Sequence, residues 1–184
     1  MSGFAGKKIL VTGGSGFLGA PVIAQLLDRG ARREDITVPR SARHDLRLPA
    51  ACAEVVAGQD LVLHLAANAG GIGWNRLHPG SLFYDNAAMG IHLMEESRKA
   101  GVKKFVQIGT VCAYPFQPLH IPFREDDLWE GYPERTNAPY GMAKKMMMVM
   151  GQAYRQEYDF NVIYLLPVNL YGPRDHFFEP EKSH

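Results

Sequence analysis

The sequence predicts an α/β fold built on a doubly wound parallel β-sheet. Two observations point to it. Apolar runs of strand length alternate with longer segments of helical spacing, and a glycine-rich turn joins the first run to the first helical segment. A chain of 184 residues, 46% hydrophobic and 21% charged, can bury a core of its own, so we expect one dinucleotide-binding domain over residues 1–184.

The first half of the chain supplies three of the expected strands. The apolar run Lys8–Thr12 is typical of a buried strand, and it leads through the glycine turn into a helix that we place at Phe17–Arg29. A second strand is expected at Ile36–Val38, a short helix at Leu48–Val56 and a third strand at Leu61–Leu65.

The second half repeats the alternation of helix and strand. Helical spacing predicts a helix over Ser81–Ala100, and a strand follows at Lys104–Ile108. Asn137 is expected to cap a helix that runs to Tyr158, before a last strand at Asn161–Leu166. Strands that alternate with helices form a parallel sheet covered on both faces, which is the dinucleotide-binding (Rossmann) architecture.

The glycine turn Thr12–Gly19 predicts a site for the pyrophosphate of a dinucleotide. Glycines there allow a tight turn, a close approach of the backbone to phosphate, and close packing of helix on strand. The segment Val38–Arg43 decides between cofactors, because an acidic residue there favours NAD and an arginine favours the 2′-phosphate of NADP. It holds two arginines and no acid, so we expect NADP with Arg40 as the main contact; the alternative is that both arginines are merely solvated.

A candidate catalytic pair stands further along the chain. Tyr140 and Lys144 are four residues apart and share one helix face, so the lysine ammonium group is expected to favour the phenolate form of the tyrosine. Tyr140 can then exchange a proton with a substrate oxygen while hydride moves to or from a nicotinamide. Thr110 follows a strand at its carboxyl end and can hydrogen-bond the same oxygen.

Cys112 stands two residues beyond Thr110, where it could act as a base that removes a carbon-bound proton beside a ketone. The alternative is a small buried hydrophobic residue. The proline-rich stretch Pro115–Pro139 is a long loop that we expect to cover the active site, with a solvated acidic run at Glu125–Asp127. His64 ends an apolar strand and is expected to be structural.

Charge and cysteine content exclude several classes of protein. The formal net charge of +1 gives no reason to expect a nucleic-acid or membrane partner, and the apolar runs are far below the roughly 20 residues that span a bilayer. Two cysteines imply no disulfide framework, which fits a reducing cytoplasm. We expect no metal site.

The motifs resemble those of a known family. The chain is similar to the extended short-chain dehydrogenase/reductases at Thr12–Gly19, His64–Ala67, Thr110 and the pair Tyr140 and Lys144. Within them it resembles the GDP-L-fucose synthase family, over Gly70–Gly73, Cys112–Pro115, Asn137–Lys144 and Pro167–Pro173. This resemblance implies epimerisation of GDP-4-keto-6-deoxy-mannose at C3 and C5, followed by reduction of the C4 ketone with NADPH.

The resemblance also implies roles for individual residues. The catalytic residues would be Thr110, Cys112, Tyr140, Lys144 and, as the acid of epimerisation, His184, if one residue is inserted near Glu179. The residues implied to bind NADP are Gly13, Gly14, Gly16, Phe17, Leu18, Gly19, Arg40, Asp45, Leu46, Leu65, Ala66, Ala67, Lys144, Pro167 and Asn169. In this superfamily the helices near residues 81–100 and 140–158 commonly pair in a homodimer.

Family members continue into a second, smaller domain that supplies most contacts to the nucleotide sugar. We expect that substrate domain to be absent or truncated in these 184 residues. Two alternatives stay open: a GDP-sugar 3,5-epimerase without net reduction, and a truncated, non-catalytic NADP-binding module. Sugar-nucleotide dehydratases are disfavoured, because they would show Asp-Glu where this chain has Val111-Cys112.

Overall fold

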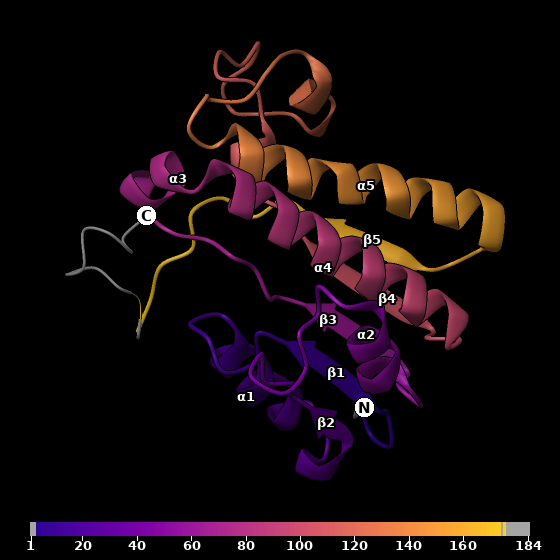
Figure 1. Ribbon diagram of the computed structural model, residues 1–184. Helices are drawn as coiled ribbons and strands as arrows, with labels where there is room; N and C mark the ends of the chain where they lie inside the picture. Colours follow the sequence, from indigo (N-terminus) through magenta and orange to yellow (C-terminus); the bar gives the residue numbers. More distant parts are fainter. Residues whose placement is uncertain (1–2, 174, 176–184) are drawn as a thin grey trace.

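A computed structural model describes residues 3–173 and 175 of the chain, and its centre is a five-stranded parallel sheet (Figure 1). The strand order is β2-β1-β3-β4-β5, and every pair of neighbours is parallel. The predicted doubly wound sheet is therefore confirmed. Its strands are β1 (Ile9–Thr12), β2 (Ile36–Thr37), β3 (Leu61–His64), β4 (Lys104–Ile108) and β5 (Val162–Leu165).

Helices follow the strands in the predicted alternation. They are α1 (Gly19–Asp28), α2 (Pro49–Val56), α3 (Ile72–Leu77), α4 (Pro79–Lys99) and α5 (Ala138–Tyr158), with short 3₁₀ turns η1 (Arg33–Asp35), η2 (Val111–Ala113) and η3 (Glu125–Trp129). Helix α3 was not expected, because the glycines before it hide any helical spacing. Asn137 occupies the N-cap position of α5, but its side chain makes no capping bond and accepts one from Asn75 Nδ2 at 2.9 Å instead.

The parallel register lines up side chains in rows across the sheet. Leu10, Val62, Phe105 and Val162 are register partners on neighbouring strands, and all are buried in the main core cluster. Leu93 of α4 and Met147 of α5 pack on this row. The opposite face carries a smaller cluster, in which Ile9 and Val11 pack against α1. Helices thus cover both faces at β1, and the larger core lies under α4 and α5.

A second row lies two residues further along each strand. Thr12, His64, Gln107 and Tyr164 are register partners on β1, β3, β4 and β5, and they face the same side as the apolar row. Thr12, His64 and Gln107 are buried, and Tyr164 is partly buried against the core cluster. The apolar core therefore ends in a polar row just before the carboxyl ends of the strands, which is where sites form in such sheets.

Helices α4 and α5 lie side by side over this half of the sheet (Figure 1). Gly90 allows their close approach, because a Cβ atom there would collide with the sulfur of Met147. At their far ends the Tyr154 hydroxyl donates to Glu95 at 2.8 Å, and Arg98 stacks 4.2 Å above the Tyr158 ring. No helix in the described part of the chain is long and apolar enough to cross a membrane.

The proline-rich loop is docked on the start of α5. Lys145 donates to the carbonyl of Leu128 and lies 4.4 Å from the centroid of the Trp129 ring. The prediction of a solvated acidic run is wrong for Asp127, which is buried. Its carboxylate pairs with His120 Nδ1 at 2.8 Å and accepts from the backbone of Arg124, so it holds η3 together.

A buried carboxylate clamps the first two strands at their amino ends. Asp35 Oδ1 accepts from Lys8 Nζ at 2.7 Å and Asp35 Oδ2 from Arg32 Nε at 2.6 Å. These hydrogen bonds lower the pKa of Asp35 to about 2, although burial opposes the shift. A depressed carboxyl pKa stabilises the fold above the unfolded-state pKa of about 4, and this stabilisation is lost as the pH falls towards 2.

We therefore expect Asp35→Asn to lower the thermal unfolding midpoint at pH 7, with a deficit that shrinks between about pH 4 and pH 2. Circular dichroism melts across that range would measure it. Glu34→Gln is the matched control, because the Glu34 carboxylate is largely exposed and water screens its ion pair with Arg32. A deficit that is the same at pH 7 and pH 2 would show that charge is not what Asp35 contributes.

Candidate active site

The glycine turn between β1 and α1 is built for close backbone contact. Gly13 has φ of +68°, and a Cβ atom there would lie 2.8 Å from the backbone nitrogen of Ala66. At Gly19 a Cβ atom would collide with the carbonyl oxygen of Gly13. Neither position tolerates a larger residue, so the start of α1 is brought against the ends of β1 and β3. This exposes a helix N-terminus of the kind that binds phosphate.

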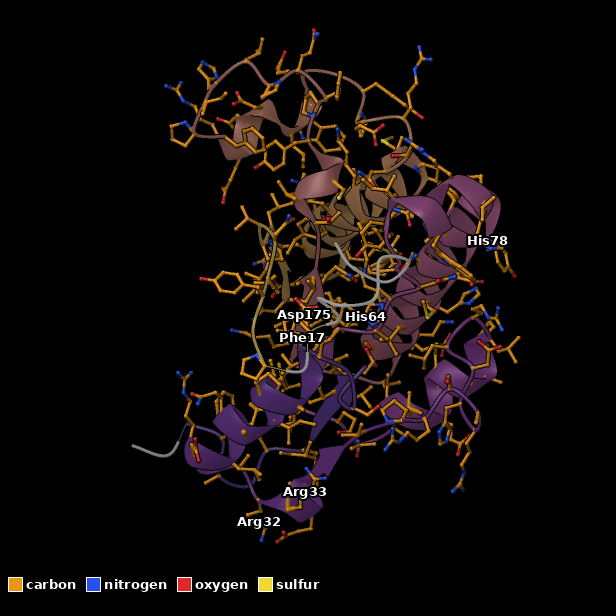
Figure 2. All side chains as sticks on the ribbon, turned by 90° about the vertical axis from the view of Figure 1, so that its left-hand side faces the viewer. Phe17, Arg32, Arg33, His64, His78 and Asp175 are labelled. Carbon is orange, nitrogen blue, oxygen red and sulfur yellow. The ribbon has the colours of Figure 1, made fainter. Side chains whose placement is uncertain are left out.

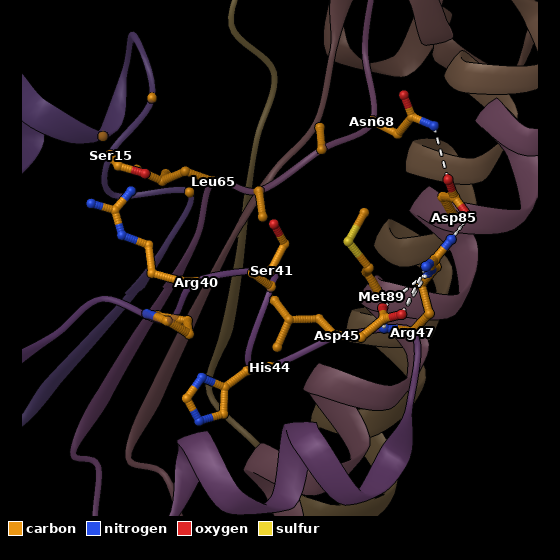
Figure 3. Close-up of a pocket in the computed structure, with 18 of the residues that line it drawn as sticks. Ser15, Arg40, Ser41, His44, Asp45, Arg47, Leu65, Asn68, Asp85 and Met89 are labelled. Atoms are coloured by element: carbon orange, nitrogen blue, oxygen red, sulfur yellow. Dashed lines mark hydrogen bonds and ion pairs between the residues drawn. The ribbon is translucent and has the colours of Figure 1, made fainter.

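A cavity of about 630 Å³ opens in front of this turn (Figure 3). Its walls come from the turn itself, the loop after β2, the segment after β3, and α4. Most of the residues predicted to bind a dinucleotide line it: Gly13, Gly16, Phe17, Leu18, Gly19, Arg40, Asp45, Leu46, Leu65, Ala66 and Ala67. Gly14 does not line it and instead packs closely against Val38 and Ile23.

The two acidic side chains that line the cavity, Asp45 and Asp85, are already ion-paired. Arg47 forms an ion pair with Asp45 at 2.7 Å and with Asp85 at 3.1 Å, and Asp85 also accepts from Asn68 at 2.8 Å (Figure 3). Hydrogen bonds from Arg47 lower the pKa of Asp45 to about 2. Arg40 forms no ion pair within the described residues. Its charge is thus available on the cavity wall for an anionic group.

The predicted catalytic residues meet where α5 crosses η2. Gly141 follows Tyr140, and a Cβ atom at Gly141 would collide with the carbonyl of Cys112. Thr110 is buried, and its hydroxyl accepts from the backbone nitrogen of Cys112 at 3.1 Å, which fixes the segment after β4. Glycine at position 141 therefore allows Tyr140 to sit beside the Thr110–Cys112 segment.

Burial dominates the electrostatics of this cluster. Loss of water, and to a smaller extent the negative charge that Cys112 carries when ionised, raise the pKa of Tyr140 to about 12. Burial lowers the pKa of Lys144, which is 3% exposed, to about 8. We expected the ammonium group, 5.8 Å from the Tyr140 ring centroid, to favour the phenolate, but desolvation outweighs it. In the structure Tyr140 is a phenol at neutral pH and holds a proton that it can donate.

His64 has the structural role that the sequence predicted. Figure 2 shows it inside the molecule, whereas Arg32, Arg33 and His78 lie at the periphery. Its Nδ1 atom is 2.8 Å from the hydroxyl of Thr12, which also accepts from the backbone nitrogen of Ala66 at 3.2 Å. Burial lowers the pKa of His64 to about 3, so the ring is neutral and ties β1 to the segment that lines the cavity.

The remaining predicted residues lie after β5. Pro167 is half-buried and Asn169 is exposed, and neither lines the cavity. The chain then passes the glycine turn, since a Cβ atom at Gly172 would lie 3.8 Å from the Phe17 ring. Lys144 also lies outside the cavity wall, one helical turn after Tyr140 on α5. His184, the predicted acid, lies outside the described residues.

Sequence reasoning missed three contributors to the site. Arg47 neutralises the cavity acids, and its role depends on Asp85, which is distant in sequence. Gly141 sets the distance between α5 and Cys112. The position of Gly141 inside the Tyr140–Lys144 motif could have indicated this role from the sequence. Gln107, in the middle of the polar row, interrupts an apolar strand and could have been noticed for that reason.

The fold and the site together define a nucleotide-binding α/β protein with a dehydrogenase-type tyrosine–lysine pair. Residues 9–184 match the model of the NAD dependent epimerase/dehydratase family, and the chain belongs to that family. The resemblance to GDP-L-fucose synthases is confirmed by a "GDP-L-fucose synthase" of Sinorhizobium fredii, 34% identical over 174 residues. That match covers 94% of this chain and 54% of the relative, so the chain spans about half the length of the curated relatives that it matches.

Solved structures agree with this assignment. MlghC from Campylobacter jejuni, a GDP-mannoheptose C4 reductase with NADP bound, superposes with a TM-score of 0.83 at 26% identity, covering 90% of this chain and 52% of MlghC. A GDP-L-fucose synthetase from Naegleria fowleri bound to NADP gives a TM-score of 0.81 at 28% identity, covering 98% of this chain and 59% of the other.

Gly141→Ala should separate α5 from the Thr110–Cys112 segment, because backbone must move to admit the new methyl group. We expect the thermal midpoint to fall by about 2–8 °C, following a cost of about 1–2 kcal/mol. Gly80→Ala is the matched control, since it is also in the first turn of a long helix and its added methyl group meets open space. Equal midpoints for the two variants, measured by calorimetry, would refute a close contact at Gly141.

Proposed function

We propose that this protein is an NADPH-dependent epimerase/reductase of a GDP-linked 4-keto-6-deoxy-hexose, like the GDP-L-fucose synthases that it resembles. The observation that carries the proposal is the meeting of Cys112 with Tyr140 across Gly141, at the same carboxyl edge of the sheet as a cavity of about 630 Å³. A simple reductase has no use for a thiol base at that place. The relatives named for GDP-sugar chemistry support the choice of substrate.

The cavity fits NADPH on its own geometry. The backbone at Gly13 and Gly19 leaves room for a pyrophosphate, and Arg40 is free to pair with a 2′-phosphate. NADPH, when bound, supplies the hydride for the C4 carbon of the sugar. The chain supplies the matching proton: the phenol of Tyr140 donates it to the C4 oxygen, while the Thr110 hydroxyl hydrogen-bonds that oxygen.

The raised pKa of Tyr140 suits reduction. A phenol with a pKa of about 12 is almost fully protonated at neutral pH, so it is ready to act as an acid. The Lys144 ammonium group stabilises the phenolate that remains after the transfer. Because burial lowers the pKa of Lys144 to about 8, this support declines as the pH rises through 8. The rate of reduction is therefore expected to fall on the alkaline side of that value.

Epimerisation requires a base and an acid on opposite faces of the sugar. In the proposed reaction the Cys112 thiolate takes the proton bound to C3 or C5, and the electron pair moves into an enolate on the C4 oxygen. A second group returns a proton to the other face of the same carbon. Family resemblance assigns this acid to His184. The ketone is regenerated, so no oxidant or reductant is consumed before the final reduction.

We also propose that the protein forms a homodimer through α4 and α5. Large apolar side chains are exposed on both helices: Phe83, Tyr84, Ile91, Val149 and Tyr158. Pairing of two such surfaces as a four-helix bundle would bury them. Light scattering of the purified protein tests this part separately from catalysis.

The function is tested by mixing the purified protein with NADPH and GDP-4-keto-6-deoxy-mannose in D₂O. The proposed function predicts loss of NADPH absorbance together with deuterium at C3 and C5 of the product. Deuterium incorporation without NADPH loss would indicate a 3,5-epimerase. Binding of NADPH without either change would indicate a cofactor-binding module.

Arg40→Ala should weaken NADPH binding by about tenfold or more and leave NADH binding nearly unchanged. The reason is that a charge-assisted contact to the 2′-phosphate is lost, and NADH has no such phosphate. Fluorescence titration of both nucleotides measures the ratio. Arg43→Ala is the matched control, because Arg43 does not line the cavity. A parallel loss of NADH affinity would place Arg40 elsewhere on the cofactor.

Tyr140→Phe and Cys112→Ser should separate the two halves of the reaction. The tyrosine variant is expected to lose at least about a hundredfold in NADPH oxidation while it still incorporates deuterium, because general acid catalysis contributes factors of that order. The serine variant is expected to lose deuterium incorporation, because a hydroxyl is a far weaker base than a thiolate. Mass spectrometry of the sugar measures the second effect; retained exchange in Cys112→Ser would assign the base to another residue.

A further inference from the structure

Gln107 is a buried side chain whose amide oxygen makes no hydrogen bond within the described residues. It is 0% exposed in the middle of β4, and its Nε2 atom donates to the carbonyl of Ile108 at 2.9 Å. Its Oε1 atom is buried without a hydrogen-bond partner. Buried amide oxygens are rarely left unpaired, because the loss of hydration is costly.

Lys144 interacts with one residue on each of the two strands that flank the strand of Gln107. Its backbone carbonyl accepts from the Tyr164 hydroxyl of β5 at 2.9 Å. Its charge also contributes to the lowered pKa of His64 on β3. Gln107 is the register partner of both His64 and Tyr164 on the same face. Because adjacent strands lie about 5 Å apart, Gln107 stands on the strand between the two residues that interact with Lys144.

The groups around Lys144 do not balance its charge. Tyr140 faces it from α5, Tyr164 contacts it from β5, and His64 interacts with it from β3. Cys112, on η2, interacts with Tyr140. The two tyrosines are neutral near pH 7, and burial keeps His64 neutral by lowering its pKa. No carboxylate in the described part of the chain forms an ion pair with Lys144. A buried ammonium group in this position needs neutral acceptors for its protons.

We propose that Gln107 is a positioning residue for Lys144, with its Oε1 atom accepting the hydrogen bond of a buried water molecule that in turn accepts from Lys144 Nζ. The site is polar on several sides, which is what an internal water requires. Since Thr12 can donate to His64 Nδ1, the Nε2–H of the neutral His64 ring is a further donor at this row. The importance of Gln107 for catalysis rests on the proposed function, in which Lys144 supports the Tyr140 phenolate.

The test is an NMR titration of Lys144 in protein labelled with ¹³C at the lysine ε-carbon, with the signal assigned by its loss in Lys144→Arg. Gln107→Met keeps the side-chain length and removes the acceptor, so the Lys144 midpoint should fall by about one pH unit. Gln107→Glu adds a negative charge and should raise it. Gln152→Met, on an exposed part of α5, is the matched control and should leave it unchanged. Unchanged midpoints in both Gln107 variants would overturn the proposal.

A measurement on the unmodified protein covers the case in which a variant does not fold. The side-chain amide protons of Gln107 should show a nuclear Overhauser contact to a long-lived water, and the Gln107 carbonyl carbon should titrate with the Lys144 midpoint. Absence of both signals would also overturn the proposal. Neither readout depends on turnover, so failure of the proposed reaction in the D₂O assay would be seen separately.

Discussion

The site depends on two places where backbone meets backbone without an intervening side chain. At the first, Gly19 lies on the carbonyl of Gly13, which brings α1 against the end of β1. At the second, Gly141 lies on the carbonyl of Cys112, which brings α5 against the segment after β4. The first contact shapes the wall of the cavity proposed to hold the cofactor, and the second sets the distance between the proposed acid and base. The intervening sheet holds both in one rigid frame, because its rows are in register from β1 to β5.

Apolar and polar side chains occupy separate rows of the sheet. The row of Leu10, Val62 and Phe105 stabilises the fold by excluding water, and the next row along the strands is polar. A polar row this deep is costly unless its members are paired. Thr12 and His64 are paired with each other, and Tyr164 is paired with Lys144. The polar row thus carries the connection between the core and the reacting groups.

The alternation of strands and helices was predictable because it rests on local spacing. The strand Lys104–Ile108 and the end of the last helix at Tyr158 agree with the structure to the residue. The α3 helix and the pairing of Asp127 with His120 were not predictable, because each depends on partners brought together by the fold. The prediction that Lys144 favours the phenolate form of Tyr140 was wrong for the same reason. The motif shows that a lysine is near, but it does not show that Lys144 is buried or how far Tyr140 is withdrawn from water.

In the proposed reaction, reduction and epimerisation make opposite demands on one site, and different elements of the structure would meet them. Reduction needs an acid, and burial at the start of α5 keeps Tyr140 protonated. Epimerisation needs a base, and the thiol that can serve stands on η2, a separate turn fixed by Thr110. The two interact, because burial is the main cause of the raised pKa of Tyr140 and negative charge on Cys112, when it is ionised, adds to it. In the proposed reaction, Tyr140 would therefore keep its proton during epimerisation and could still donate it when the ketone is reduced.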